Sequence, residues 1–286
     1  GSRKDKSEKK GGEILEMKVT DYIVEFLQRK GIHDFFGYQG TMIAHLVDSI
    51  EKNPHTRSHS SYHEQGAAFA ACGYAQAGER CACAYATSGP GAANLISGIA
   101  DAYFDSLPVV FLTGQLNTYE YSGIPGLRQQ GFQEIDIVGV TMPITKYNML
   151  VRSKEELLPA LRKAFSLAQE GRPGPVLVDI PSSVQVEELE WSEPQAASEA
   201  EELPQATPEQ LQQAAEVLNK AQRPVLLVGG GAVKGVGAVG ACGEGEAVLG
   251  DALLEPLDRL HRRGLVERGG GGGDLVGEEG SAVAVG

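Results

Sequence analysis

The sequence is poor in several residue types, and each shortage excludes a class of protein. The four cysteines (Cys72, Cys81, Cys83, Cys242) are too few for a disulfide framework and lack the paired spacing of a zinc site. The 25 lysines and arginines are outnumbered by 38 acidic residues, which argues against a nucleic-acid partner. No apolar run reaches the roughly 18 residues of a membrane span, and no signal-peptide core follows the charged first ten residues. We therefore expect a cytoplasmic protein without a membrane partner.

Aromatic residues are absent after Trp191, and residues 229–286 hold 18 of the 37 glycines. A segment that cannot bury large side chains does not readily offset the entropy that it loses on folding. We therefore expect residues 233–286 to be an atypical, glycine-rich and largely disordered tail, in which only residues 251–263 could form a helix. Because the composition changes abruptly after about residue 232, we also expect an alternative or out-of-frame end to this chain.

Between residues 17 and 185, helical and strand-like stretches alternate at short intervals. This alternation predicts an α/β fold, in which helices cover both faces of a doubly wound parallel sheet. A loop at residues 115–131 interrupts the alternation, and we expect an ordered lid there, although an exposed polar connection fits the same residues. Strand patterns lie at 33–37, 57–62, 81–86, 108–113, 144–148 and 175–179, and helical patterns lie at 21–30, 41–51, 64–77, 91–104, 133–138 and 154–170.

The flanking segments complete the predicted domain organisation. Residues 1–16 are rich in lysine at their start, and we expect them to be disordered. Residues 186–206 are expected to form an acidic linker, because residues 186–209 hold eight glutamates and no lysine or arginine. Residues 207–232 begin an incomplete second α/β domain, with a helix-capping signal at Thr207-Pro208-Glu209 and an apolar strand pattern at 223–228.

Glu64 begins a predicted helix directly after a predicted strand, and the next strand-to-helix turn is Ser88-Gly89-Pro90-Gly91. Doubly wound sheets bind ligands beside such turns, at the carboxyl ends of the strands. The small residues after Glu64 would admit a flat ligand, with which the carboxyl group could exchange a proton. Two structural alternatives stay open: an acid at a helix start commonly only stabilises the helix dipole, and a glycine turn can be a simple tight turn.

Six strings stand in this order within residues 17–185: FGYQG, YHEQGAAFAACGYA, ATSGPGAANLISGIADAYFDSLPVV, TGQ, GFQEIDIVGVTMPITKYN and GRPGPVLVDIPSSV. Together they resemble the pyrimidine-binding domain of thiamine diphosphate-dependent enzymes, and in particular that of the acetohydroxyacid (acetolactate) synthase large subunit. The resemblance implies a transferase or lyase, namely a carboligase or decarboxylase that acts on 2-oxo acids such as pyruvate.

The resemblance also implies roles for single residues. Glu64 would be the catalytic glutamate that hydrogen-bonds N1′ of the cofactor's pyrimidine ring, and Gln133 would approach the substrate or Glu64. Structural alternatives remain for Gln133 as a helix N-terminal residue, Tyr38 as a core residue and Asn94 as a helix-surface group. The implied cofactor-binding residues are Tyr38, Gly40, Glu64, Ser88, Gly89, Pro90, Gly91 and Asn94.

The chain also departs from the family pattern. Gly37-Tyr38-Gln39-Gly40-Thr41 replaces a GYPGG loop, which leaves the donor substrate open. The family's magnesium motif, GDG with a following Asn, is incomplete. Relative to the family, we therefore expect a truncated or disrupted version of a longer enzyme. We therefore predict no metal ligand, expect Mg²⁺ to be held by a domain absent here, and find no support for the FAD that relatives can bind.

Three hypotheses about function follow. The chain could supply the pyrimidine half of an enzyme, as a homodimer or with a full-length relative. Alternatively, it could be a catalytically silent fragment that binds or dimerises with a full-length relative. A nucleotide-binding module that uses the glycine turns is the third hypothesis.

Overall fold

The computed structural model describes residues 15–78, 80–121, 124, 126–191, 206–222, 225–227 and 282–284. The chain divides into two compact units, Gly1–Glu199 and Ala200–Gly286. The larger unit carries every residue that the sequence singles out as a site candidate.

The first unit is built around a six-stranded sheet of order β3-β2-β4-β5-β7-β6, in which every neighbouring pair is parallel. The chain runs from β2 outward to β3 and then returns to lay down the other strands on the opposite side of β2. This order confirms the predicted doubly wound α/β fold. The strands are β2 (Asp34–Gly37), β3 (Arg57–Ser60), β4 (Ala82–Ala86), β5 (Val109–Gln115), β6 (Tyr147–Leu150) and β7 (Val176–Pro181).

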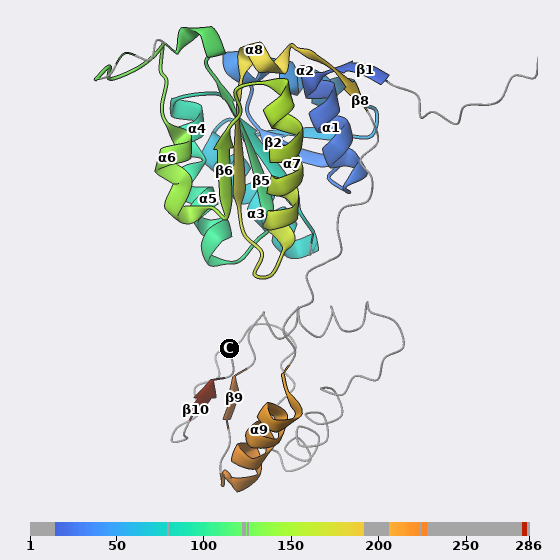
Figure 1. The fold of residues 1–286 in the computed structure, drawn as a ribbon, viewed down its shortest axis with the longest axis vertical. Coiled ribbons are helices and arrows are strands. Elements are labelled where there is room, and N and C mark those ends of the chain that lie inside the picture. The colour runs from blue at the N-terminus through green and yellow to red at the C-terminus, as the bar shows by residue number, and fades with distance from the viewer. Residues whose placement is uncertain are drawn as a thin grey trace, which may run out of the picture. The chain divides into compact units, whose positions relative to one another are not determined.

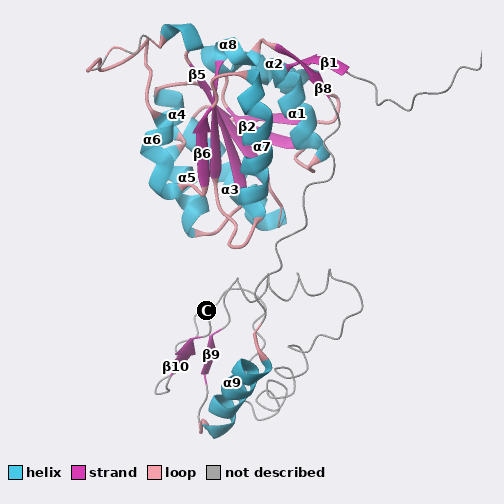
Figure 2. Cartoon of the chain, in the orientation of Figure 1, coloured by secondary structure: helices cyan, strands magenta, loops and turns pink. Residues whose placement is uncertain are grey.

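Helices cover both faces of this sheet (Figures 1 and 2). One face packs against α1 (Val19–Arg29), α2 (Ala44–Lys52) and α7 (Lys154–Gln169). The other face packs against α3 (Glu64–Gly78), α4 (Pro90–Asn94), α5 (Ile96–Phe104) and α6 (Ile137–Thr141). Shorter helical turns are η1 (Thr41–Ile43), η2 (Thr118–Glu120), η3 (Met142–Ile144) and α8 (Ser182–Gln185).

The central strands alternate between the two cores, as the two-residue period of a strand requires. In β4, Cys83 and Tyr85 pack with the α1 side, whereas Ala82, Ala84 and Ala86 pack with the α3 side. The α3 side of the core is rich in alanine, because α3 contributes Ala67, Ala68, Ala71 and Ala75 to it. Small side chains on both partners let α3 pack closely on the sheet, and this packing fixes the helix that begins at Glu64.

The predicted start of the helix at residues 133–138 is wrong. Helix α6 begins at Ile137, where Asp136 acts as the N-cap and its Oδ1 atom accepts a hydrogen bond from the Gly139 N–H at 2.9 Å. Gln133 lies outside the helix with a φ of 55°. An N-cap residue has non-helical backbone angles, so the capping bond of Asp136 determines where the helix starts.

The first unit also extends beyond the predicted limits of its fold. Strand β1 (Leu15–Lys18) pairs antiparallel with β8 (Glu188–Trp191), so the structure differs from the expectation that residues 1–16 and 186–206 lack regular structure throughout. Leu189 is 7% exposed and joins the core, which the count of glutamates in this segment did not predict. Residues 1–14 and 192–205 lie outside the described residues.

The second unit contains α9 (Pro208–Lys220) and a parallel pair of short strands, β9 (Val225–Leu227) and β10 (Ala282–Ala284). Thr207 caps α9 as the sequence predicts: its Oγ1 atom accepts from the Gln210 N–H at 3.3 Å, and Gln210 Oε1 accepts from the Thr207 N–H at 2.8 Å. Strand β10 falls in the segment expected to be largely disordered. The helix expected at residues 251–263 lies outside the described residues.

Candidate functional site

The candidate site lies where the strand order reverses, between β2 and β4. Loops that leave neighbouring strands in opposite directions open a crevice at such a point. Here Gly40, after β2, lies against Thr87, after β4: a Cβ atom at Gly40 would come within 2.4 Å of the Thr87 Cβ atom. The Thr87 hydroxyl oxygen also accepts a hydrogen bond from the Met42 N–H at 3.2 Å. The two loops are therefore held together at this position.

Glu64 is the first residue of α3, and its half-buried side chain reaches the turn after β4. Its Oε2 atom accepts a hydrogen bond from Asn94 Nδ2 at 2.9 Å. Its Oε1 atom faces Gly91, where an added Cβ atom would lie 3.1 Å away. The described residues provide Oε1 with no hydrogen-bond donor, so one carboxylate oxygen is oriented by a neutral amide and the other remains available.

Gly89 and Gln133 meet through their backbones. Gly89 has a φ of 62°, and a Cβ atom there would lie 1.8 Å from the Gln133 carbonyl oxygen. Both the left-handed conformation and this contact require glycine. The structure thus brings the Gln133 segment onto the glycine turn, and the alternative that Gln133 is a helix N-terminal residue is wrong, because α6 starts four residues later.

The remaining predicted site residues surround this turn. The half-buried Tyr38 ring lies 6.2 Å from the ring of Tyr62, which is 95% exposed, so Tyr38 is not a core residue. Ser88 is buried, whereas Pro90 is exposed as the first residue of α4. The bond from Asn94 to Glu64 likewise argues against a purely surface position for Asn94.

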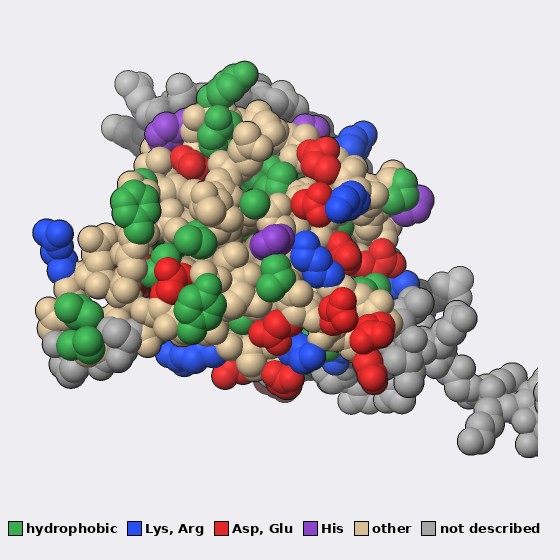
Figure 3. All heavy atoms as spheres, turned by 90° about the horizontal axis from the view of Figure 1, so that it is seen from above, with side chains coloured by type: hydrophobic (Ala, Val, Ile, Leu, Met, Phe, Trp, Pro, Cys, Tyr) green, Lys and Arg blue, Asp and Glu red, His purple; other side chains and the backbone are tan. Residues whose placement is uncertain are grey.

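Two large aromatic side chains near this end of the sheet are open to solvent, because Tyr62 is 95% and Phe132 is 82% exposed. Figure 3 views the domain from above, the side on which Figure 1 places α8. Charged side chains gather on one part of this face, and hydrophobic and uncharged surface covers much of the rest.

Sequence reasoning missed a buried polar cluster beside the site. Asp179 on β7 is 1% exposed, and it accepts hydrogen bonds from Thr113 Oγ1 at 2.7 Å and from Gln115 Nε2 at 2.9 Å. Burial raises the pKa of Asp179 to about 7, reinforced by Asp136 and Glu134 and opposed by these two hydrogen bonds. The available signal was an acid inside the otherwise apolar strand VLVDIP.

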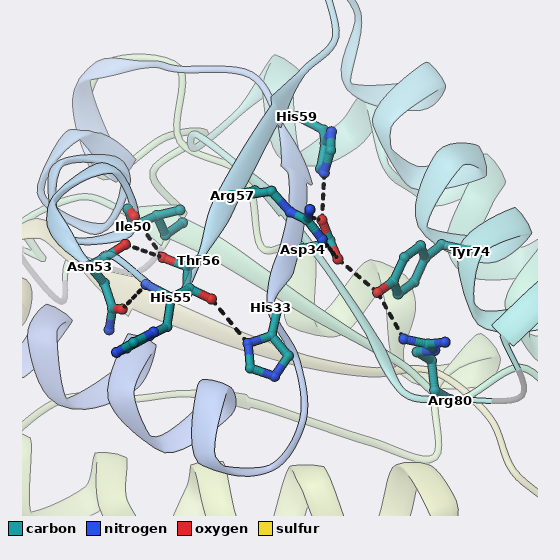
Figure 4. Close-up of polar contacts among 10 residues, drawn as sticks. All are labelled: His33, Asp34, Ile50, Asn53, His55, Thr56, Arg57, His59, Tyr74 and Arg80. Atoms are coloured by element: carbon teal, nitrogen blue, oxygen red, sulfur yellow. Dashed lines mark hydrogen bonds and ion pairs between the residues drawn. The ribbon is translucent and has the colours of Figure 1, made fainter.

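A second polar cluster, centred on Asp34, fixes the far part of α3 (Figure 4). Arg57 donates to both Asp34 carboxylate oxygens at 2.9 and 3.0 Å, His59 Nε2 lies 2.8 Å from Oδ1, and the Tyr74 hydroxyl donates to Oδ2 at 2.8 Å. Burial alone would raise the pKa of Asp34, but the bonds from His59, Arg57 and Tyr74 lower it to about 2. Helix α3 is thus bonded near Glu64 at one end and through Tyr74 toward the other.

Within the part of the chain that the structure describes, no group of three or more His, Cys, Asp or Glu side chains is arranged to hold a metal ion. No described helix has the length and apolar character needed to cross a membrane.

Residues 17–140 match a protein family described as "Thiamine pyrophosphate enzyme, N-terminal TPP binding domain". Among curated proteins, the chain is 40% identical over 214 residues to acetolactate synthase isozyme 1 large subunit of Escherichia coli, an alignment that covers 75% of this chain and 37% of that protein. It is 44% identical over 214 residues to the acetolactate synthase large subunit of Corynebacterium glutamicum, with 74% of this chain and 33% of that protein covered.

A plant relative gives the same result. Acetolactate synthase 1, chloroplastic, of Zea mays is 41% identical over 218 residues, which cover 75% of this chain and 33% of the relative. The chain therefore spans about a third of the length of these curated relatives.

Proposed function

We propose that this chain supplies the pyrimidine-binding half of an acetolactate synthase-like enzyme. The match of residues 17–140 to the thiamine pyrophosphate enzyme N-terminal TPP binding domain supports this proposal. The substrates of this enzyme would be 2-oxo acids such as pyruvate, and its cofactor would be thiamine diphosphate. The names of the acetolactate synthase relatives support this substrate class.

The observation that carries the proposal is the geometry around Glu64. A flat, hydrogen-bonding ring needs an oriented acid, a side-chain-free surface and a crevice. Asn94 orients Oε2, Gly91 lets the backbone of the turn approach Oε1 without a side chain between them, and both lie at the reversal of strand order. These residues fit the pyrimidine ring of the cofactor.

In this proposal Glu64 hydrogen-bonds the pyrimidine N1′ atom and shares a proton with it, while Asn94 keeps the carboxyl group in place. Gly89, Gly91 and the Gln133 backbone shape the wall beside the ring, and Tyr38 and Gly40 border it from the loop after β2. Thiamine diphosphate, when bound, supplies the nucleophilic carbon needed for 2-oxo acid decarboxylation and carboligation. The protein contributes orientation and a proton at Glu64.

The diphosphate and Mg²⁺ would be held by a second chain, namely a full-length relative, because this sequence carries only an incomplete magnesium motif. The solvent-exposed side of α3 is a suitable surface for that chain. Phe69 is 44% exposed there, and Gly66 and Gly73 are exposed with no atoms within 4 Å of an added Cβ atom. Such a surface allows close approach of a partner next to Glu64.

A complementation experiment tests this function. The chain is mixed with a full-length acetolactate synthase large subunit that is inactive because its glutamate corresponding to Glu64 has been replaced. We expect the wild-type chain to restore acetolactate formation from pyruvate when thiamine diphosphate and Mg²⁺ are present. The Glu64→Gln variant should lower the restored rate by about 10²- to 10⁴-fold, the usual range for a lost proton-transfer group.

Glu155→Gln is the control, because Glu155 is likewise an acid in the first turn of a helix but is exposed and lies on α7. It should leave the restored rate unchanged. If the wild-type chain binds the full-length subunit without restoring any activity, the silent-fragment hypothesis replaces this proposal. Equal rates for the wild type and Glu64→Gln would remove the assigned role of Glu64.

A further inference from the structure

Asp179 is the most deeply buried acid in the described part of the sheet, and it is bound only by neutral groups. It is 1% exposed and lies on β7 opposite Thr113 of β5. Its Oδ1 atom accepts from the Thr113 hydroxyl at 2.7 Å and its Oδ2 atom accepts from Gln115 Nε2 at 2.9 Å. No cation forms an ion pair with it among the described residues. Burial without a cation is costly, and such groups are commonly retained for a role other than stability.

Gln115 connects this buried acid to the chain segment over the site. Its Nε2 atom donates both to Asp179 Oδ2 and, at 3.2 Å, to the Ile135 carbonyl oxygen. Its Oε1 atom accepts from the Leu116 N–H at 2.9 Å. The carboxamide of Gln115, which is 2% exposed, therefore has every donor and its acceptor engaged, and its orientation is fixed.

The segment held in this way reaches the candidate cofactor site. Two residues before Ile135, the Gln133 carbonyl oxygen presses on Gly89, where an added Cβ atom would lie only 1.8 Å away. Gly89 begins the turn that leads into α4, whose Asn94 donates to Glu64. A continuous set of contacts thus runs from Asp179 through Gln115 and the 133–135 segment to the residues around Glu64.

We propose that Asp179 is a positioning residue of the candidate cofactor site: through Gln115 it holds residues 133–135 against the Gly89 turn, and its protonation changes how firmly they are held. The inference takes its functional meaning from the proposed function, but it concerns contacts within this chain alone.

Protonation can change this contact without breaking the cluster. The hydrogen bond from Gln115 is charge-assisted when Asp179 is ionised and weaker when it is neutral. The Thr113 hydroxyl can donate to the ionised carboxylate or, after rotation, accept the proton of the neutral carboxyl group. Asp179 therefore keeps both hydrogen-bond partners whether it is ionised or neutral. The hydrogen bond from Gln115 is stronger when Asp179 is ionised.

The titratable and charged groups around Asp179 come from three segments. Burial raises the pKa of Asp179 to about 7, and Asp136 and Glu134, before α6, contribute to this rise. Tyr121, after η2, has a buried hydroxyl without a hydrogen-bond partner among the described residues. Burial raises the pKa of this hydroxyl, and the negative charge of Asp179 adds to the rise. The positive charge of Arg152, after β6, lowers the pKa of Tyr121.

Nuclear magnetic resonance of the full chain tests the inference without any cofactor. The Gln115 side-chain amide and the Gly89 backbone amide are followed from about pH 5.5 to about pH 8.5, which brackets the expected midpoint. We expect both signals to shift with one shared midpoint, and the shift to disappear in Asp179→Asn, which preserves the shape but cannot ionise. Gln115→Met should leave the Asp179 carboxyl carbon titrating while Gly89 no longer responds.

Glu134→Gln is the control for nearby charge. It removes one negative charge that acts on Asp179 and leaves Thr113 and Gln115 in place, so it should lower the shared midpoint and retain the coupling. A Gly89 signal that does not titrate in the wild type overturns the inference, as does one that still titrates in Asp179→Asn or in Gln115→Met. Because no thiamine compound is present, failure here is distinguishable from failure of the complementation experiment.

Discussion

Two aspartates are buried in the parallel sheet, and their hydrogen-bond partners differ. One is bonded by two basic side chains and a tyrosine, and the other only by neutral side chains. Asp34, at the start of β2, receives bonds from Arg57, His59 and Tyr74, and its pKa falls to about 2. Asp179, on β7, receives bonds only from Thr113 and Gln115, and its pKa rises to about 7. Both acids are nearly inaccessible to solvent, but Asp34 lies beside the exposed side chains of Arg57 and His59, whereas Asp179 lies deeper in the sheet. The difference therefore comes both from the partners and from the depth of burial. We infer that Asp34 stabilises the fold, whereas the charge of Asp179 costs stability.

The largest expected effect is a gain in the free energy of unfolding when the buried charge of Asp179 is removed. The folded-state pKa of Asp179 lies above its ordinary value of 3.8, so the folded state binds more protons and its stability falls as pH rises from about 4 to about 7. The difference corresponds to an upper limit of roughly 4 kcal/mol. Asp179→Asn should therefore raise the free energy of unfolding near pH 8 and have little effect near pH 4. Urea unfolding followed by circular dichroism measures both; a loss of stability near pH 8 would contradict the comparison.

Asp34→Asn is expected to lower the free energy of unfolding, by less than Asp179→Asn raises it. The folded-state pKa of Asp34 is depressed, so its contribution is present above the ordinary value of 3.8 and is lost as pH falls through about 2. The variant should lose at most roughly 2 kcal/mol at pH 7, because Arg57 and His59 are 71% and 47% exposed and solvent screens them. The same urea experiment at pH 7 and near pH 2 measures the loss. A loss that persists unchanged near pH 2 would show that charge is not its source.

The smallest effect is expected for Tyr74→Phe, which removes one of the hydrogen bonds to Asp34. Its cost should be about 1 kcal/mol near neutral pH. Because this bond favours ionised Asp34, its loss should raise the pKa of Asp34 and move acid unfolding to a higher pH. An acid titration followed by circular dichroism provides the measurement. Tyr103→Phe, on the exposed side of α5, is the control and should leave the acid midpoint unchanged.

The sequence predicted the sheet well because its main signals are local. Alternating apolar residues and short turns located β4, β5 and β7 within a few residues, and the small residues after Glu64 indicated a closely packed helix. The contact between Glu64 and Asn94 joins the turns after β3 and β4, which flank β2 and are not neighbours in the sheet, so the sequence did not predict it. The functional roles assigned to these residues stay predictions.

Features that depend on distant partners were not predictable in the same way. The pairing of β1 with β8 joins segments about 170 residues apart, and neither segment carries a strong strand pattern of its own. The Asp179 cluster arises only once β5 and β7 are known to be neighbours and in register. The start of α6 was placed too early because the capping bond of Asp136 competes with the helical pattern of residues 133–138.

The β1–β8 pair also has a consequence for engineering the domain. Leu15 lies opposite Trp191, so the entry and exit points of the first unit are adjacent. A short designed connection could therefore fuse these points, and new termini could be opened at a distant surface loop without passing a strand through the sheet. Such a circular permutant would place its new termini away from the crevice while the order of strands in the sheet remained the same.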